Sequence, residues 1–348
     1  AIMVTAVAVF AAVTAFLACI QVFTIGLALI GVPMTQTLAL AGTGGSLLLA
    51  LAFASRFRRY YDGPPPAAPG TERAPRFVRG TVWLVAVGAF TALGWVWLQL
   101  LRVAWYRTPQ RWDSLWYHVP AVHEWVMRGQ VFFYPLDPRL AGAADQVHFA
   151  GWVNYPMAVE LTGFFTYFLV GTDRLVDASN LWYWPLAITA LVVIAGQLGA
   201  RGPAKWLAGA LLFGVSQFVG QSATAYVDPG FNAAVMASIA AATLVLFGGP
   251  GLLKWKLVLF GAALGLMIGA KGSGLPYAAV LLTITLAVMA WRLGIRRSPV
   301  AFARMAGVFA VMMAVGGYWS VRNFVHTGNP VYPVQLQVGC LLYTSPSP

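Results

Sequence analysis

The stretch Thr81-Val-Trp-Leu-Val-Ala-Val-Gly-Ala-Phe-Thr-Ala-Leu-Gly-Trp-Val-Trp-Leu-Gln-Leu-Leu-Arg-Val-Ala104 decides the class of fold. A helix needs about 20 apolar residues to cross the hydrocarbon core of a bilayer, and this run supplies them with Arg102 as its one charged residue. The whole chain shares this character, because 59% of its 348 residues are hydrophobic and 9% are charged. A soluble domain carries about 25% charged residues. The sequence therefore predicts an all-α fold, a polytopic bundle of transmembrane helices.

Apolar runs of similar length lie on both sides of this stretch, and about nine spans are expected in total. Residues 1–54 supply two of them. The first begins without Met or a charged segment, which indicates a truncated span rather than a cleavable signal peptide. The tail 340–348 resembles a translated sequencing adapter, so the chain is expected to be a fragment at both ends. The expected spans cover residues 3–31, 34–54, 81–104, 181–199, 205–226, 230–248, 255–270, 274–292 and 301–320.

Two long connections flank residues 81–104. The preceding one, residues 55–80, carries six arginines and a run of three prolines, and the positive-inside rule assigns it to the cytoplasm. Residues 105–180 then form a large extracytoplasmic loop within a transmembrane core at 81–335. A short apolar stretch in this loop, 157–170, carries Glu160. It is too short for a span, so we expect an interfacial or re-entrant juxtamembrane helix.

The distribution of charge supports this topology. With 157–170 kept outside, the inner face holds 14 Lys and Arg against two acids, and the outer face holds eight against eight. The net charge of +12 thus lies wholly inside, where it marks topology and attracts anionic membrane lipids. No nucleic-acid partner is implied. The sequence predicts an integral membrane protein whose polar chemistry faces outward.

The loop opens with Trp112-Asp-Ser-Leu-Trp-Tyr-His-Val-Pro120, an acid among aromatic residues at the membrane rim. Asp113 is the candidate general base, because a carboxylate within reach of an acceptor hydroxyl can take its proton as the new bond forms. The simpler alternative is that Asp113 caps a helix starting near Ser114. His118 and His123 are five residues apart and do not share a helical face. We therefore expect His118 to be a hydrogen-bonding neighbour and not a metal ligand.

Three charged residues beyond the loop are candidates for substrate binding. Asp228, in Tyr-Val-Asp-Pro-Gly, is expected at the outer face, either as a functional acid or as the residue that closes a turn. Lys271 interrupts a long apolar region. It needs a partner such as a phosphate, unless it snorkels from a helix end. Arg322 follows the last span and could hold the same anion with its fork of donors, or lie among outer lipid headgroups.

Taken in order, these residues resemble motifs of the GT-C superfamily of polytopic glycosyltransferases. The most similar branch is the dolichyl-phosphate-mannose mannosyltransferase-like one, which includes lipid A aminoarabinose transferases. The resemblance covers roughly residues 81–335, and all its motifs fall on the side assigned to the outside. They are Asp113, Tyr117-His-Val-Pro120, Trp125-Val-Met-Arg-Gly129, Asn154-Tyr155-Pro156, Glu160, Tyr226-Val-Asp228, Lys271-Gly-Ser-Gly274, Arg322-Asn323 and Thr327-Gly-Asn-Pro-Val-Tyr-Pro333.

The resemblance implies an inverting sugar transfer from a polyprenyl-phosphate donor to a lipid, glycan or protein acceptor, at the outer face of a bacterial inner membrane. It implies Asp113 as the base and Lys271 and Arg322 as contacts to the donor phosphate. The further substrate-binding candidates are Tyr117, His118, Tyr155, Glu160 and Asp228.

This chain departs from the family in two respects. Many members have Asp-Glu where it has Asp113-Ser114, so the spacing does not support a metal site, although a divalent metal stays open. About two additional spans precede the usual first one.

A transporter or lipid-binding membrane protein without catalysis is the alternative. Asp228 and Lys271 would then form an intramembrane pair along a substrate path. Such a pair should lie near the bilayer midplane. An enzyme of the resembled type instead needs its charges on one side, beside Asp113.

Overall fold

The computed structural model describes residues 2–60, 75–134, 152–294, 298–334, 336–338 and 341–343. Within these ranges, eight helices are long and apolar enough to cross a membrane. The all-helical membrane bundle expected from composition is thus confirmed, apart from one small strand pair, β1 (Leu336–Val338) with β2 (Leu341–Tyr343). The eight are α1 (Ile2–Leu29), α2 (Gln36–Tyr60), α3 (Arg76–Tyr106), η3 (Asp173–Tyr183) continuing into α7 (Trp184–Gln197), α10 (Asp228–Phe247), α11 (Leu253–Ala270), α12 (Gly274–Leu293) and α13 (Ser298–Gly316).

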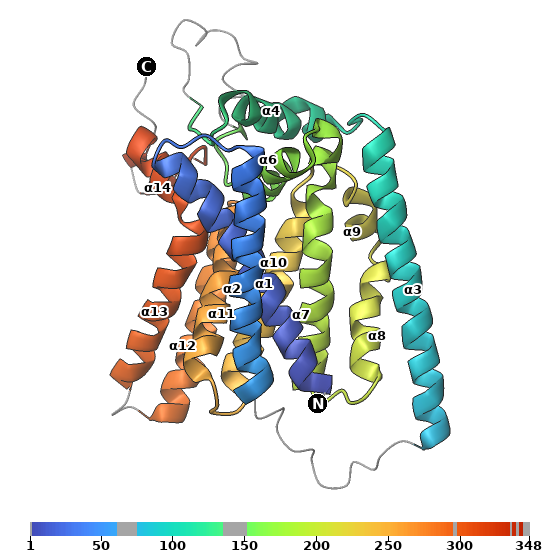
Figure 1. Ribbon diagram of the computed structural model, residues 1–348. Helices are drawn as coiled ribbons and strands as arrows, with labels where there is room; N and C mark the ends of the chain where they lie inside the picture. Colours follow the sequence, from blue (N-terminus) through green and yellow to red (C-terminus); the bar gives the residue numbers. More distant parts are fainter. Residues whose placement is uncertain are drawn as a thin grey trace, which may run out of the picture.

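The span expected at 205–226 is not one helix. The chain forms α8 (Ala204–Ala210), a 3₁₀ turn η4 (Leu211–Gly214) and α9 (Ser216–Gln221), with Val215 outside helical geometry at φ −89° and ψ 85°. Glycines at 209, 214 and 220 weaken helix formation in this segment. These short pieces still lead the chain from the end of α7 back to the start of α10 (Figure 1).

Other short helices lie at the end of the bundle where α3 finishes (Figure 1). They are η1 (Ser114–His118), α4 (Val119–Arg128), α6 (Ala158–Val170) and α14 (Tyr318–Thr327). Helix α6 is the short apolar stretch of the loop. An interfacial helix would leave one apolar face to lipid, but the first nine residues of α6 are all buried. Protein surrounds this part of the helix, whereas residues 167–170 are partly or fully exposed, and the burial favours the re-entrant alternative over the interfacial one.

A stripe of glycines brings α11 and α13 together. Gly261, Gly265 and Gly269 follow one another at intervals of four along α11, and so lie on one face. A Cβ atom on Gly265 would come within 2.6 Å of the Val315 Cβ, and one on Gly261 within 2.7 Å of the Val308 carbonyl oxygen. Small residues of this kind let two membrane helices approach backbone to backbone. The contact holds α13, and therefore α14, against the rest of the bundle.

Candidate functional site

Asp113 lies inside a helical segment and does not cap it. Its backbone is helical, at φ −64° and ψ −34°, and its side chain makes no capping hydrogen bond. The alternative that Asp113 is a helix cap is therefore wrong. The residues that follow form the π-helical turn η1, which turns Ser114 and His118 into the protein. Single π turns of this type recur at functional sites. Among the described residues, the partly exposed Asp113 carboxylate has no hydrogen bond or ion pair.

His118 forms a buried pair with Glu160 of α6. The His118 Nδ1 and Glu160 Oε1 atoms are 2.5 Å apart, and the two side chains are 3% and 2% exposed. His118 thus has Glu160 as its hydrogen-bond partner, and its part in substrate binding stays a prediction. The second Glu160 oxygen is buried without a hydrogen-bond partner among the described residues. The pair ties η1 to α6, and so fixes the turn on which Asp113 sits.

Asn180 of η3 positions the loop that carries Asp228. Its side-chain amide donates to the carbonyl oxygens of Thr224, at 2.9 Å, and Tyr226, at 2.5 Å. Its own oxygen accepts from the Gly230 N–H at 2.9 Å. The Ser114 hydroxyl holds the same loop from the other side by accepting from the Ala225 N–H at 3.1 Å.

Asp228 and Lys271 form an ion pair at the ends of two spans. Lys271 Nζ and Asp228 Oδ1 are 2.6 Å apart, and the two side chains are 45% and 42% exposed. Asp228 begins α10 with Pro229 in its first turn, so Asp-Pro-Gly opens a helix rather than forming a separate turn. Lys271 follows the last residue of α11 in an extended conformation. The partner that Lys271 requires is thus a carboxylate, and two of the three ammonium protons remain for another group.

Tyr117 lies at the centre of these groups. Burial raises the pKa of its phenol, and the nearby carboxylates of Glu160, Asp113 and Asp228 raise it further, as does Tyr155. Tyr155 in turn packs against Gly272, where an added Cβ would lie 3.8 Å from the ring. The structure therefore brings seven of the eight predicted site residues into one group. We name it the outer cluster, after the side that the positive-inside rule predicts for it: Asp113, Tyr117, His118, Tyr155, Glu160, Asp228 and Lys271.

The eighth residue, Arg322 of α14, has a different environment. Its side chain is buried, and its Nη2 donates to the Asn154 carbonyl at 2.8 Å. Trp319 lies against the guanidinium at 4.9 Å from the ring centre. Burial lowers the Arg322 pKa to about 10. Arg322 thus anchors the segment that carries Tyr155, and its Nη1 is buried without a hydrogen-bond partner among the described residues. Its contact to a donor phosphate stays a prediction.

The spacing of the acids in the sequence did not support a metal site, and Asn180 was not among the predicted site residues. Among the described residues, no three His, Cys, Asp or Glu side chains are grouped so as to hold a metal ion. Asn180 and Ser114 position the site but were not expected to contribute to it. Their signal in the sequence is weak: each is a small polar residue that becomes fully buried, and a buried polar group must find partners.

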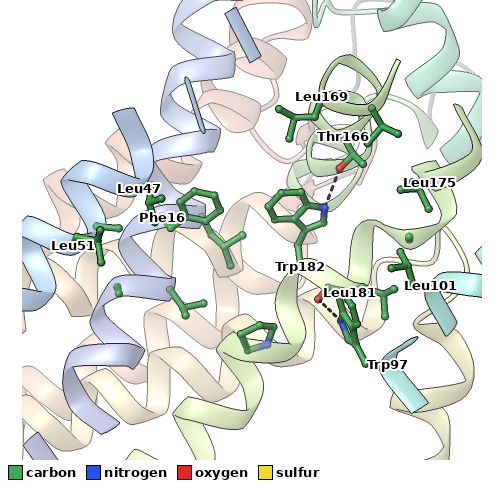
Figure 2. Close-up of a pocket in the computed structure, with 17 residues that line it drawn as sticks. Phe16, Leu47, Leu51, Trp97, Leu101, Thr166, Leu169, Leu175, Leu181 and Trp182 are labelled. Atoms are coloured by element: carbon green, nitrogen blue, oxygen red, sulfur yellow. Dashed lines mark hydrogen bonds between the residues drawn. The ribbon is translucent and has the colours of Figure 1, made fainter. Parts of the chain in front are cut away.

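A large apolar pocket of about 520 Å³ lies below α6, between α1, α2, α3, η3 and the start of α7. Figure 2 shows that its walls are hydrocarbon and indole, including Phe16, Leu51 and Leu101. Two tryptophans on its wall have their N–H groups satisfied: Trp182 donates to Thr166 at 2.9 Å, and Trp97 donates to the Leu181 carbonyl at 3.3 Å. With no polar group left to offer, this pocket suits a hydrocarbon chain and not a sugar.

No family model, curated protein or solved structure matches this chain.

Proposed function

We propose that this protein is a membrane glycosyltransferase that moves a sugar from a polyprenyl-phosphate donor to an acceptor at the outer face. The observation that carries the proposal is the difference between the carboxylates of the outer cluster. Glu160 holds His118 and Asp228 holds Lys271, whereas Asp113 makes no hydrogen bond or ion pair with any described residue. An unpaired, partly exposed carboxylate is the member of such a group that can accept a proton.

The reaction follows from these roles. The acceptor hydroxyl or amine attacks the anomeric carbon of the donor sugar, and its proton passes to Asp113. The bond between the anomeric carbon and the phosphate oxygen breaks, and the electron pair leaves with the lipid phosphate. Lys271 offsets the charge that develops on that phosphate, which is the kind of stabilisation that commonly dominates catalysis. Attack from the face opposite the phosphate inverts the anomeric configuration.

Burial around the cluster supports this assignment. The His118–Glu160 pair fixes η1 from inside, so the backbone that carries Asp113 is anchored to α6. Tyr117 stays neutral because its pKa is raised, and it can donate a hydrogen bond beside the base. The apolar pocket below α6 offers room for part of an isoprenoid chain.

The competing transporter proposal depends on where the charged pair lies. Asp228 opens α10 and Lys271 follows the end of α11, so the pair occupies helix ends and is nearly half exposed. A transport path would instead favour charges within the spans.

The test uses purified protein in proteoliposomes. The substrates are undecaprenyl-phosphate-linked pentoses and hexoses labelled in the sugar, with a bacterial membrane lipid extract as acceptor. Asp113→Asn should lower label transfer about 10²–10⁴-fold, the usual contribution of a general base. Glu124→Gln, on the exposed side of α4, is the matched control and should leave transfer unchanged. Near-normal transfer by a folded Asp113→Asn protein would overturn the proposed role.

A further inference from the structure

A polar recess lies on the other side of η1, between the outer end of α3 and the end of α9. Its volume is about 430 Å³. Arg107 and Arg111 line it, both exposed and neither in an ion pair with a described residue. Leu100 and Val103, in the last turns of α3, form its apolar wall. The recess thus joins a cationic part to an apolar part at the end of a span.

Asp177 of η3 is the buried group of this recess. The residue is 8% exposed, and one of its carboxylate oxygens has no hydrogen-bond partner among the described residues. The Ser114 hydroxyl and the Ala225 N–H are its polar neighbours. Because Asp177 lines the recess and its ionised carboxylate carries a negative charge, it favours a ligand that places a hydrogen-bond donor there. Asp177 also lines a second recess of about 350 Å³ that continues past Arg107.

We propose that this recess binds a membrane phospholipid whose headgroup carries both a phosphodiester and an N–H or O–H donor. The phosphodiester pairs with Arg107 and Arg111, because guanidinium groups bind phosphate through their fork of donors. The headgroup amine or hydroxyl donates to Asp177. The acyl chain runs along Leu100 and Val103 of α3. Phosphatidylethanolamine and phosphatidylglycerol meet these requirements, whereas phosphatidylcholine lacks the donor.

The full chain in detergent is titrated with dioleoyl-phosphatidylethanolamine, -phosphatidylglycerol and -phosphatidylcholine, and native mass spectrometry counts the bound lipid. The first two should bind about tenfold tighter than phosphatidylcholine, the ratio that one hydrogen bond to a charged group supplies. Asp177→Asn should remove this preference. Glu124→Gln, which changes a partly exposed acid of α4 that lines neither recess, is the matched control.

The arginines are tested separately, so that the proposal stands even if Asp177→Asn fails to fold. Arg107→Gln and Arg111→Gln should each weaken all three lipids about tenfold. Arg102→Gln, at an exposed arginine of α3 outside the recess, should not. Two results overturn the proposal: equal binding of the three lipids by the parent protein, or undiminished binding by the double variant Arg107→Gln with Arg111→Gln. Binding of millimolar inorganic phosphate, with none of the three lipids bound, would identify free phosphate as the ligand and refute the lipid.

Discussion

The buried His118–Glu160 pair should contribute measurably to the free energy of unfolding. Both side chains are almost fully enclosed, and their polar atoms are 2.5 Å apart. Replacing His118 by Leu leaves the Glu160 carboxyl buried with neither oxygen paired. Removing one partner of such a pair typically costs about 3–5 kcal/mol, which is a large share of the usual stability of about 5–15 kcal/mol. The double replacement His118→Leu with Glu160→Leu should cost less than the single one, because no buried charge remains.

The same helical region supplies the matched control. Glu124 and Arg128 of α4 form a 3.9 Å pair whose side chains are 40% and 60% exposed, and exposed pairs contribute about 0–1 kcal/mol. Unfolding of the purified protein in mixed micelles, titrated with sodium dodecyl sulfate and followed by tryptophan fluorescence, measures each difference. A loss below about 1 kcal/mol for His118→Leu, equal to that of Glu124→Gln, would refute the reasoning.

Three further outcomes are expected. Lys271→Gln should lower sugar transfer about 10–100-fold in the proteoliposome assay and change stability by less than about 1 kcal/mol, since its ion pair is half exposed. Gly265→Ala should destabilise the bundle by about 1–3 kcal/mol in the micelle titration, because its Cβ meets Val315, whereas Gly307→Ala has nothing within 4 Å and should not. The raised pKa of Tyr117 means that its neutral form stabilises the fold below pH 10 and that this contribution is lost as pH rises further. Tyr117→Phe should therefore lose less stability than the parent protein across that alkaline range.

Apolar length was a sufficient guide to most of the bundle, because every span must be long and apolar to cross lipid. It was a poor guide at 205–226. Hydropathy sums the apolar character of the side chains and holds no information on the backbone, so it does not predict that Val215 leaves helical geometry. Nor could it decide how α6 lies, since whether protein or lipid surrounds a short apolar helix depends on tertiary packing.

The residues of the outer cluster were largely predictable for a related reason. Charged groups are mostly confined to the ends of spans. Once Asp113, Asp228 and Lys271 were assigned to the same side of the membrane, they were therefore expected to lie close together. Arg322 shows the limit of this reasoning. A basic residue after the last span can face lipid, substrate or protein, and only the contacts with Asn154 and Trp319 reveal that it faces protein.

The interrupted segment from α8 to α9 bears on how the protein is made. Its 3₁₀ turn and the kink at Val215 break the regular hydrogen-bonding of a helix, and lipid offers no replacement partners. Such a segment is a poor substrate for partitioning into the bilayer by itself. Its neighbours α3 and α7 precede it in the chain and so leave the ribosome first. In the folded protein, Phe90 of α3 packs edge-on against Trp206 of α8, with the ring centres 6.0 Å apart. We therefore expect α3 and α7 to stay at the translocon during synthesis until the segment from α8 to α9 has packed between them.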